Sequence, residues 1–227
     1  CALERHKPID TLFDQYGDFV AMGTIADVMP VLGENRILIR RGLAALNRKR
    51  RPGLRSLIKE SCIDRREITV AIIGFILAPR LNAAGRMGRT SLTIDLLLTD
   101  DDNEATALTQ ELCSLNMERK QVESAIFEEA QAHLMKNLPK GPIVLAGRGW
   151  FQGVMGIVAA RITEQFLFPS VVISIDEEGV GRGSCRSFSG FRIYSALEKC
   201  SDLLVNFGGH EMAAGITILE ENIDAFR

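Results

Sequence analysis

The sequence predicts an α/β protein built of two parts joined by a long helix, and three observations lead to this prediction. Apolar residues recur at helical spacing from 103 to about 136, which corresponds to a helix of roughly 50 Å at 1.5 Å per residue. Beyond residue 142, strand-like and helix-like segments alternate. Between these regions, the segment Leu138-Pro-Lys-Gly-Pro142 is typical of a helix end. We therefore expect a first part over 1–100, a connecting helix over 101–138 and a second, smaller part over 139–227.

The first part is expected to begin with a strand and to continue in helices. An apolar run at 19–26 predicts a buried strand, and a later run at 67–77 has a helical period that ends at Ala78-Pro79. A loop is expected over 80–90. Further helices are predicted at 34–47, 54–60 and 91–98.

The second part is expected to be a compact α/β domain. The strands are predicted at 143–146, 170–175, 179–187 and 213–219, and the helices at 154–166 and 193–206.

Composition is that of a globular protein with no membrane segment. The 227 residues are 46% hydrophobic and 25% charged, with a net charge of −2. No apolar run approaches the roughly 20 residues that span a bilayer, and the charged start does not resemble a signal peptide. The five cysteines include no C-x-x-C pair, which favours a reduced, cytoplasmic setting. Because the chain starts at Cys1, inside an apparent helix, we expect it to be a piece of a longer protein.

One carboxylate, Asp27, follows the predicted strand in the segment Gly23-Thr-Ile-Ala-Asp-Val-Met-Pro30. Ligands of α/β sheets bind at the carboxyl ends of strands, and a carboxylate there suits a hard cation such as Mg²⁺ or Mn²⁺. An aspartate in this place can equally cap a helix or stabilise a turn. The residues leave both interpretations open.

Two arginine-bearing segments are candidate phosphate sites. In 78–88, Arg80, Asn82 and Arg86 alternate with small residues that would let a backbone approach. In the predicted strand over 179–187, side chains two residues apart point the same way, so Arg182, Ser184 and Arg186 share one face. The alternatives are a helix cap with solvated arginines and an exposed strand face.

The segment Gly208-Gly209-His210 is the third candidate. Glycines accept positive φ and present bare N–H groups, as in many phosphate-binding loops, while the imidazole would point at the same ligand. A helix C-cap followed by a turn is the alternative. Trp150, before the predicted helix, could stack on a base, although a tryptophan at such a junction is more often part of the core.

Taken in order, these segments resemble the DHH phosphoesterase superfamily, and within it the RecJ-type single-strand-specific 5′→3′ DNA exonucleases. The segments at 23–30 and 79–86 are similar to motifs of the DHH domain. Those at 153–161, 183–187 and 208–215 are similar to motifs of the DHHA1 domain. The resemblance covers nearly the whole chain, as the end of a DHH domain followed by a DHHA1 domain.

The resemblance implies a nuclease that hydrolyses phosphodiesters with two Mn²⁺ or Mg²⁺ ions and acts in DNA repair and recombination. It implies that Asp27 is a metal ligand and that His210 reaches the scissile phosphate from the second domain, in a cleft that admits one strand. The implied partners are single-stranded DNA with a 5′ end, single-strand-binding protein and a helicase. The implied substrate-binding residues are Arg80, Asn82, Arg86, Arg182, Ser184, Arg186, Ser187, Gly208 and Gly209.

The chain departs from the family pattern at three places. RecJ-type proteins commonly have Trp-His where this chain has Trp150-Phe151, and often an aspartate near Arg89. The His-x-Asp, Asp and Asp-His-His motifs that supply most metal ligands are absent, and the only histidines are at 6, 133 and 210. Since one carboxylate cannot hold two metals, we expect these residues alone to be inactive. A DHH enzyme acting on short oligonucleotides or dinucleotides and a non-catalytic nucleic-acid-binding DHHA1 module remain alternatives.

Overall fold

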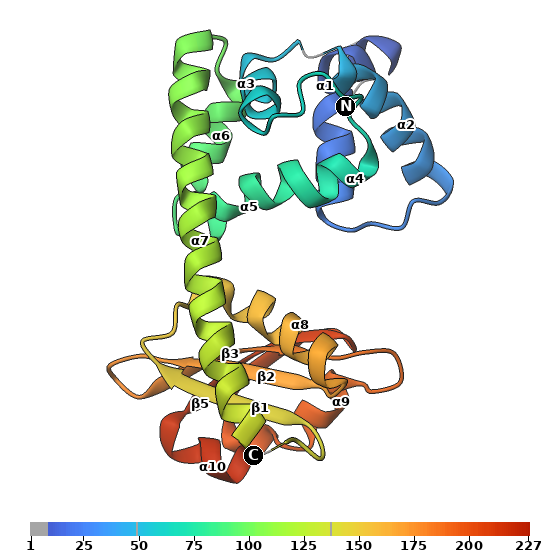
Figure 1. Ribbon diagram of the computed structural model, residues 1–227. Helices are drawn as coiled ribbons and strands as arrows, with labels where there is room; N and C mark the ends of the chain where they lie inside the picture. Colours follow the sequence, from blue (N-terminus) through green and yellow to red (C-terminus); the bar gives the residue numbers. More distant parts are fainter. Residues whose placement is uncertain (1–8, 49, 137) are drawn as a thin grey trace. The chain divides into compact units, whose positions relative to one another are not determined.

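The computed structural model describes residues 9–48, 50–136 and 138–227. The chain divides into two compact units, residues 1–117 and 118–227, and each is described by itself. The division falls inside the helix α7 (Asp102–Lys136), which confirms the long helix that the apolar period predicted (Figure 1). The expected helical start at Cys1, and His6 with it, lie outside the described residues.

The first unit is helical, and its described residues contain no strand. The predicted helices at 34–47, 54–60 and 91–98 are confirmed. The elements are α1 (Ile9–Ala26), α2 (Gly33–Asn47), α3 (Pro52–Glu60), α4 (Val70–Ile72), the π-helical η1 (Ile73–Leu77), α5 (Ala78–Arg86), α6 (Thr90–Leu98) and the first half of α7.

The predicted strand at 19–26 is wrong, because these residues form the last turns of α1. Ala21, Met22 and Ile25 are buried, and their spacing places them on one face of a helix. A short apolar run fits a buried helix as well as a buried strand, and the period does not decide between them. Asp27 therefore follows a helix rather than a strand.

The predicted loop over 80–90 is also wrong over most of its length. The helix α5 continues directly from η1 and ends at Arg86. Pro79 lies in the first turn of α5, where a missing N–H group breaks no hydrogen bond of that helix. The chain leaves the helix at Gly88, whose φ of +77° is the left-handed conformation that favours glycine.

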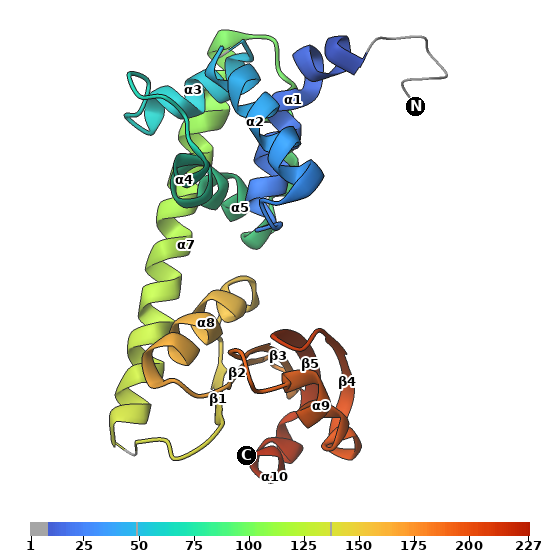
Figure 2. The same cartoon turned by 90° about the vertical axis from the view of Figure 1, so that its right-hand side faces the viewer.

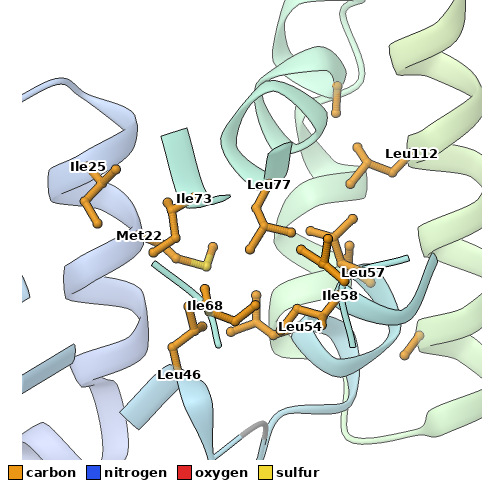
Figure 3. Packing of buried hydrophobic residues seen from close by; sticks show 14 of the residues in the cluster. Met22, Ile25, Leu46, Leu54, Leu57, Ile58, Ile68, Ile73, Leu77 and Leu112 are labelled. Carbon is orange, nitrogen blue, oxygen red and sulfur yellow. The ribbon is translucent and has the colours of Figure 1, made fainter. Parts of the chain in front are cut away.

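The core of the first unit lies where α1, α3, η1, α6 and α7 meet. Leu54, Leu57 and Ile58 of α3 pack against Leu77 and against Leu112 of α7 (Figure 3). All five of these side chains are essentially inaccessible to solvent. This packing fixes the ends of α1 and α5, which carry the candidate site residues of the unit.

The second unit is a five-stranded sheet in the order β1-β2-β3-β5-β4. Strands β1 and β2 are parallel and the other neighbours are antiparallel. The elements are β1 (Ile143–Arg148), η2 (Gln152–Val154), α8 (Met155–Phe166), β2 (Ser170–Ile175), β3 (Val180–Arg186), α9 (Ile193–Glu198), η3 (Ser201–Leu203), β4 (Leu204–Gly209), β5 (Ala213–Leu219), η4 (Glu220–Asn222) and α10 (Ile223–Phe226).

Helices cover both faces of this sheet, as expected for an α/β domain. The second half of α7 and α8 pack on one face through a cluster that includes Phe127, Val158 and Val172. On the other face, α9 and α10 pack through a cluster that includes Ile193 and Ile223 (Figures 1 and 2). The fold class predicted from the sequence is confirmed.

The predicted helix at 193–206 is wrong beyond residue 198, because its last part forms the strand β4. Leu204 and Phe207 both pack on the cluster that contains α9, although they are three residues apart. A register shift between Leu204 and Asn206 causes this spacing, since a bulge inserts one residue into the alternation of a strand. The bulged strand thus carries an apolar spacing that is typical of a helix.

Among the described helices, none combines the length and apolar character needed to cross a bilayer. The described cysteines, at 62, 113, 185 and 200, are all free thiols.

Candidate nucleic-acid interface and metal ligand

Ser184 and Arg186 form a polar pair on β3, directly below the start of helix α8. Arg186 Nη1 donates a hydrogen bond of 3.0 Å to Ser184 Oγ and another of 2.8 Å to the carbonyl of Cys185. A Cβ added at Gly156 would lie 2.7 Å from Arg186 Nη2 and 3.1 Å from Ser184 Oγ. Glycine at 156 therefore lets the helix lie directly on the pair.

The pair has the properties of an anion site. Burial lowers the pKa of Arg186 from its ordinary value, because a guanidinium loses hydration there, and a bound anion would compensate that loss. The N-terminus of α8 adds N–H groups and the positive end of the helix dipole, and its N-cap residue Val154 provides no side-chain cap. A phosphate is the anion that such a combination of donors fits best.

The side chains that the sequence placed on one strand face do share it. Strand β3 pairs with β2 and β5 without a register shift, so Arg182, Ser184 and Arg186 keep their two-residue alternation. Arg182 lies 3.6 Å from the carboxylate of Asp176, and both side chains are partly exposed. It is thus farther along the face, with a carboxylate neighbour of its own.

On the same face, the positions next to Ser184 on β5 and then on β4 are both glycines. Ser184 pairs in register with Gly215 of β5, which in turn pairs with Gly208 of β4, and both glycines are exposed. Cross-strand partners lie on the same face of a sheet, so this row forms a flat and bare surface beside the Ser184 hydroxyl. We call the exposed face of Gly208 and Gly215, with Ser184 and Arg186 at its border, the glycine shelf.

His210 lies at the end of the glycine shelf, in the turn between β4 and β5. Its backbone N–H donates a 2.8 Å hydrogen bond to the carbonyl of Ala213, which pairs in register with Arg186. The imidazole is exposed. The turn therefore brings His210 to the same end of the sheet as Arg186, and the strand β5 lies between β3 and β4.

Gly209 is needed for the shape of this turn. Its φ is +143°, and a Cβ would lie 2.5 Å from both the carbonyl oxygen of Ala213 and the Cα of Ala214. A Cβ on Gly208 would meet nothing within 4 Å. The backbone conformation therefore requires glycine at 209, whereas nothing in the structure would obstruct a side chain at 208. The alternative of a helix C-cap is wrong, because a strand precedes the turn.

Ser187 has a structural bond that the sequence did not indicate. Its hydroxyl donates a 2.7 Å hydrogen bond to the carbonyl of Phe191, and its N–H donates to Met212. The residue thereby ties the segment after β3 to the β4–β5 turn.

In the first unit, Asp27 lies in the turn that ends α1. Its N–H bonds to the Gly23 carbonyl, and the next residue, Val28, has a φ of +55°. A β-branched residue in the left-handed region costs of order 1–3 kcal/mol, and such strain occurs often at functional sites. The Asp27 residue is exposed, and its carboxylate has no hydrogen-bond or ion-pair partner among the described residues. Because it follows the C-terminus of α1, it caps no helix N-terminus, and the negative end of the α1 dipole lies beside its carboxylate.

Helix α5 brings two of its three predicted residues together. Asn82 and Arg86 are one turn apart, both exposed, and line a hollow of about 390 Å³ with Gly85. Arg80 lies on the opposite side of the helix, where its Nη1 donates 2.6 Å to the Ile76 carbonyl and its charge acts on Cys113. The small residues do not all serve a ligand, because Ala83 and Ala84 are buried in the core.

The structure also shows the surroundings of the residues at which the chain departs from the family pattern. Arg89, where the family often has an aspartate, forms an ion pair with Glu111 of α7. Trp150 is 9% exposed, and its Nε1 donates 3.0 Å to Glu129, so it belongs to the core rather than to a stacking platform. Phe151, next to it, is 40% exposed.

The metal expected from the resemblance cannot be held by the described residues alone. No group of three or more His, Cys, Asp or Glu side chains with a ligating arrangement occurs among them. Asp27 supplies one carboxylate, whereas Mg²⁺ and Mn²⁺ take up to six ligands, so a stable site needs further oxygen or nitrogen ligands.

Two features of the candidate site were not predicted from the sequence. Gly156 and Gly215 belong to the segments 153–161 and 208–215 that carry the resemblance, but neither was given a role of its own. Only the cross-strand register and the packing of α8 give them a role, because both depend on contacts between residues far apart in the chain.

Comparison with known proteins agrees with this organisation. The DHHA1 domain family matches residues 140–227, which contain the sheet. The single-stranded-DNA-specific exonuclease RecJ of Bacillus subtilis is 42% identical over 98% of this chain. RecJ of Escherichia coli is 38% identical over 99% of this chain. The chain spans 28% and 40% of the lengths of these relatives, respectively.

Solved structures give the same result. A crystal structure of RecJ from Thermus thermophilus in complex with Mg²⁺ matches 99% of this chain, with a TM-score of 0.88 and 37% identity. A second structure of that protein, in complex with Mn²⁺, matches with the same score. The chain covers 34% and 33% of those two structures.

Proposed function

We propose that this chain, which carries a DHHA1 domain and is similar to RecJ over nearly its whole length, is a DHH-superfamily protein and forms part of a RecJ-type exonuclease that degrades single-stranded DNA from the 5′ end. The observation that carries the proposal is the hydrogen-bonded pair of Ser184 and Arg186 against Gly156 of α8, within a chain that is similar to RecJ over nearly its whole length. The reaction is phosphodiester hydrolysis, and the cellular role is DNA repair and recombination.

In this proposal, the second unit binds the 5′ end of the strand. Ser184 and Arg186 bind the terminal phosphate with the N–H groups of α8, and Arg182 binds farther along the same face. The glycine shelf supports the first nucleotides, since it has no side chains between β3 and β4. His210 donates a hydrogen bond to a phosphate oxygen at the end of the shelf. The β4–β5 turn, shaped by Gly209 and tied to Ser187 through the Met212 carbonyl, holds His210 there.

The first unit contributes the remaining candidate residues. Asp27 serves as one metal ligand, and its unpaired carboxylate beside a strained turn supports this assignment. Asn82 and Arg86 contact the DNA backbone, as does Arg80 if it exchanges its bond to Ile76. Since the described residues do not complete a metal site, residues 1–227 alone are expected to bind DNA without cleaving it. The proposed partners are single-strand-binding protein and a helicase, and the proposed location is the cytoplasm.

Replacement of Asp27 tests the catalytic assignment in the intact protein. Asp27→Ala should abolish Mn²⁺-dependent release of nucleotides without lowering the unfolding temperature, because the side chain has no partner among the described residues. Asp100→Ala, which removes an exposed carboxylate between α6 and α7, is the matched control and should retain full activity. Unchanged turnover in Asp27→Ala would refute the ligand role.

Two substrate series separate the proposal from its alternatives. Activity of the intact protein should persist on strands of tens of nucleotides, whereas an oligonucleotide or dinucleotide phosphodiesterase should lose activity beyond a few nucleotides. The 227-residue chain should bind a 5′-phosphorylated strand more tightly than a 5′-hydroxyl strand, and the binding should weaken with salt. Equal binding of both strands would exclude Ser184 and Arg186 as the reader of the end.

A further inference from the structure

Phe188 is an exposed aromatic side chain that follows β3, two residues after Arg186. Its exposed fraction is 41%, whereas Phe191, three residues later, packs against the core cluster that α9 covers. Single exposed apolar residues are ordinary on protein surfaces, so only the position of Phe188 can give it a role. Its neighbours are the residues of the proposed phosphate site.

The alternation of the strand places Phe188 on the same face of the sheet as Arg186. The Ser187 N–H donates a 2.9 Å hydrogen bond to the Met212 carbonyl, which extends the pairing of β3 with β5 by one residue beyond Arg186. The Ser187 hydroxyl donates 2.7 Å to the carbonyl of Phe191, which packs in the cluster on the opposite face. Because successive side chains of an extended chain point to opposite faces, Phe188 follows Arg186 on the side of the glycine shelf.

The same register brings Phe188 close to the turn that carries His210. Arg186 pairs with Ala213, so Phe188 comes opposite Glu211, which directly follows His210 in the sequence. Two residues of an extended strand span about 6.6 Å. Phe188 therefore lies one such step from Arg186 along the chain and beside the His210 turn, near both of the proposed phosphate contacts.

The loop that carries Phe188 is tied to the β4–β5 turn. The Phe191 N–H donates 3.2 Å to the Phe188 carbonyl and closes a tight turn. Beyond it, the Ile193 N–H donates 2.9 Å to the Glu211 carbonyl, and the Arg192 guanidinium lies 2.8 Å from the Glu211 carboxylate. A ligand that contacts Phe188 thus meets a loop whose backbone is already held, which lowers the entropic cost of binding.

We propose that Phe188 stacks on the base of the 5′-terminal nucleotide, whose phosphate binds at Ser184 and Arg186. This proposal rests on the proposed function for the presence of the strand. A nuclease that removes nucleotides one after another must accept each base in turn. An aromatic ring meets that need, because every base has a π face, whereas a hydrogen-bonding side chain would distinguish between bases.

Strands with an abasic first nucleotide test the proposal in the intact protein. Binding of 5′-phosphorylated strands is measured by fluorescence anisotropy without divalent metal, so that no strand is cleaved. An abasic first nucleotide should weaken binding to the original protein about tenfold, as expected for the loss of one stacked base. Phe188→Ala should bind both strands with the same, weaker affinity. It should still prefer a 5′-phosphate to a 5′-hydroxyl, because Ser184 and Arg186 are unchanged.

Two further substitutions separate stacking from apolar contact. Phe188→Trp should keep the difference between the two strands, whereas Phe188→Leu, which is apolar but has no π face, should lose most of it. Met135→Ala is the control, since it removes a side chain of α7 in the same unit that is 60% exposed, and it should leave every affinity unchanged.

The outcomes distinguish this proposal from the proposed function. An abasic penalty that persists in Phe188→Ala, together with an intact preference for the 5′-phosphate, would overturn the stacking role alone. Equal binding of abasic and complete strands by the original protein would also overturn it. Equal binding of phosphorylated and hydroxyl strands by the original protein would overturn both, since Phe188 would then have no strand end beside it.

Discussion

The guanidinium of Arg186 donates a 3.0 Å hydrogen bond to the hydroxyl of Ser184, on the face of β3 that supports Gly156 of α8. The bond holds the two groups as a unit, so a phosphate that displaces it gains both a guanidinium and a hydroxyl donor. Burial also removes water from the charged guanidinium, which lowers its pKa, and a bound anion would compensate for the lost hydration. The pair therefore presents two donors that are already held together, as the proposed phosphate site requires.

Gly156→Ala should weaken the binding of a 5′-phosphorylated strand without unfolding the second unit. The new Cβ would meet Arg186 Nη2 at 2.7 Å, and the flexible end of the arginine moves away more easily than the helix does. Alanine in a helix is also favoured over glycine by up to about 0.5–1 kcal/mol, so the midpoint of urea unfolding should stay equal or rise.

Fluorescence anisotropy should show binding about tenfold weaker, a loss of about 1.4 kcal/mol. Gly74→Ala is the control, since its Cβ would meet only Ile25 at an ordinary 3.9 Å. A Gly156→Ala protein that binds the strand as tightly as the original would mean that α8 takes no part in the site.

The two adjacent glycines of the β4–β5 turn should respond in opposite ways. Gly209→Ala should lower the free energy of unfolding by about 1–3 kcal/mol or more, because its φ of +143° and its backbone contacts at 2.5 Å exclude a Cβ. Gly208→Ala should leave the stability nearly unchanged, since no atom lies within 4 Å of its Cβ. It should nevertheless weaken single-strand binding, because the methyl group would interrupt the glycine shelf.

Urea titration and a DNA-binding titration of both variants check this pair. Similar stability losses at 208 and 209 would show that Gly208 also serves the backbone rather than the surface.

The sequence was sufficient for the features that depend on local periodicity. The alternation along 179–187 predicted that Arg182, Ser184 and Arg186 share a face, and the paired strands keep that alternation. The apolar period of 103–136 predicted α7 to within one residue of its start. Such patterns repeat every two or every three to four residues, so a few turns or strand pairs define them.

Other features depended on contacts that no local pattern contains. The bulge of β4 gives Leu204 and Phe207 a helical spacing in a strand, and the short apolar run at 19–26 fits either element. Gly156 and Gly215 gain their roles from the packing of α8 and from the strand order, both of which are tertiary. The candidate site could therefore be proposed from its arginines, whereas the bare surface beside them follows only from the strand order.

Cys185 should make the second unit less stable at alkaline pH. Burial raises the pKa of its thiol from 9.0 to about 12, with a smaller opposing effect of the Arg186 charge. The folded state thus holds the proton more tightly than the unfolded state does. The contribution of the thiol to stability is complete below pH 9 and is lost as the pH rises from about 9 towards 12.

Comparison with Cys185→Ala isolates this effect. The free energy of unfolding of the original protein, minus that of the variant, should fall between about pH 9 and 11 by up to about 1.4 kcal/mol per pH unit. The same difference for Val172→Ala, a fully buried and non-titrating site on β2, should not change with pH. A pH-independent difference for Cys185→Ala would contradict the burial of the thiol.

Glu123 should be the carboxylate whose loss destabilises the second unit most. Its two oxygens accept bonds from Arg119 of α7 at 2.6 Å and from Arg161 of α8 at 3.1 Å, and the Arg161 guanidinium lies 3.7 Å from the ring centre of Phe127. The side chains of Glu123 and Arg119 are only 12% and 9% exposed. Breaking a buried pair leaves one charge without compensation, which costs about 3–5 kcal/mol.

Glu123→Gln should therefore lower the free energy of unfolding by an amount in that range, measured by urea titration followed by circular dichroism. The double variant Arg119→Met/Glu123→Met should lose less than Glu123→Gln alone, because it removes both charges and keeps apolar volume between α7 and α8. Asp224→Asn breaks an exposed pair with Arg227 and should change stability by less than about 1 kcal/mol. If Glu123→Gln were as mild as Asp224→Asn, the ion pairs would contribute nothing to the attachment of α7, and the apolar contacts of Phe127 and Ala130 would hold it alone.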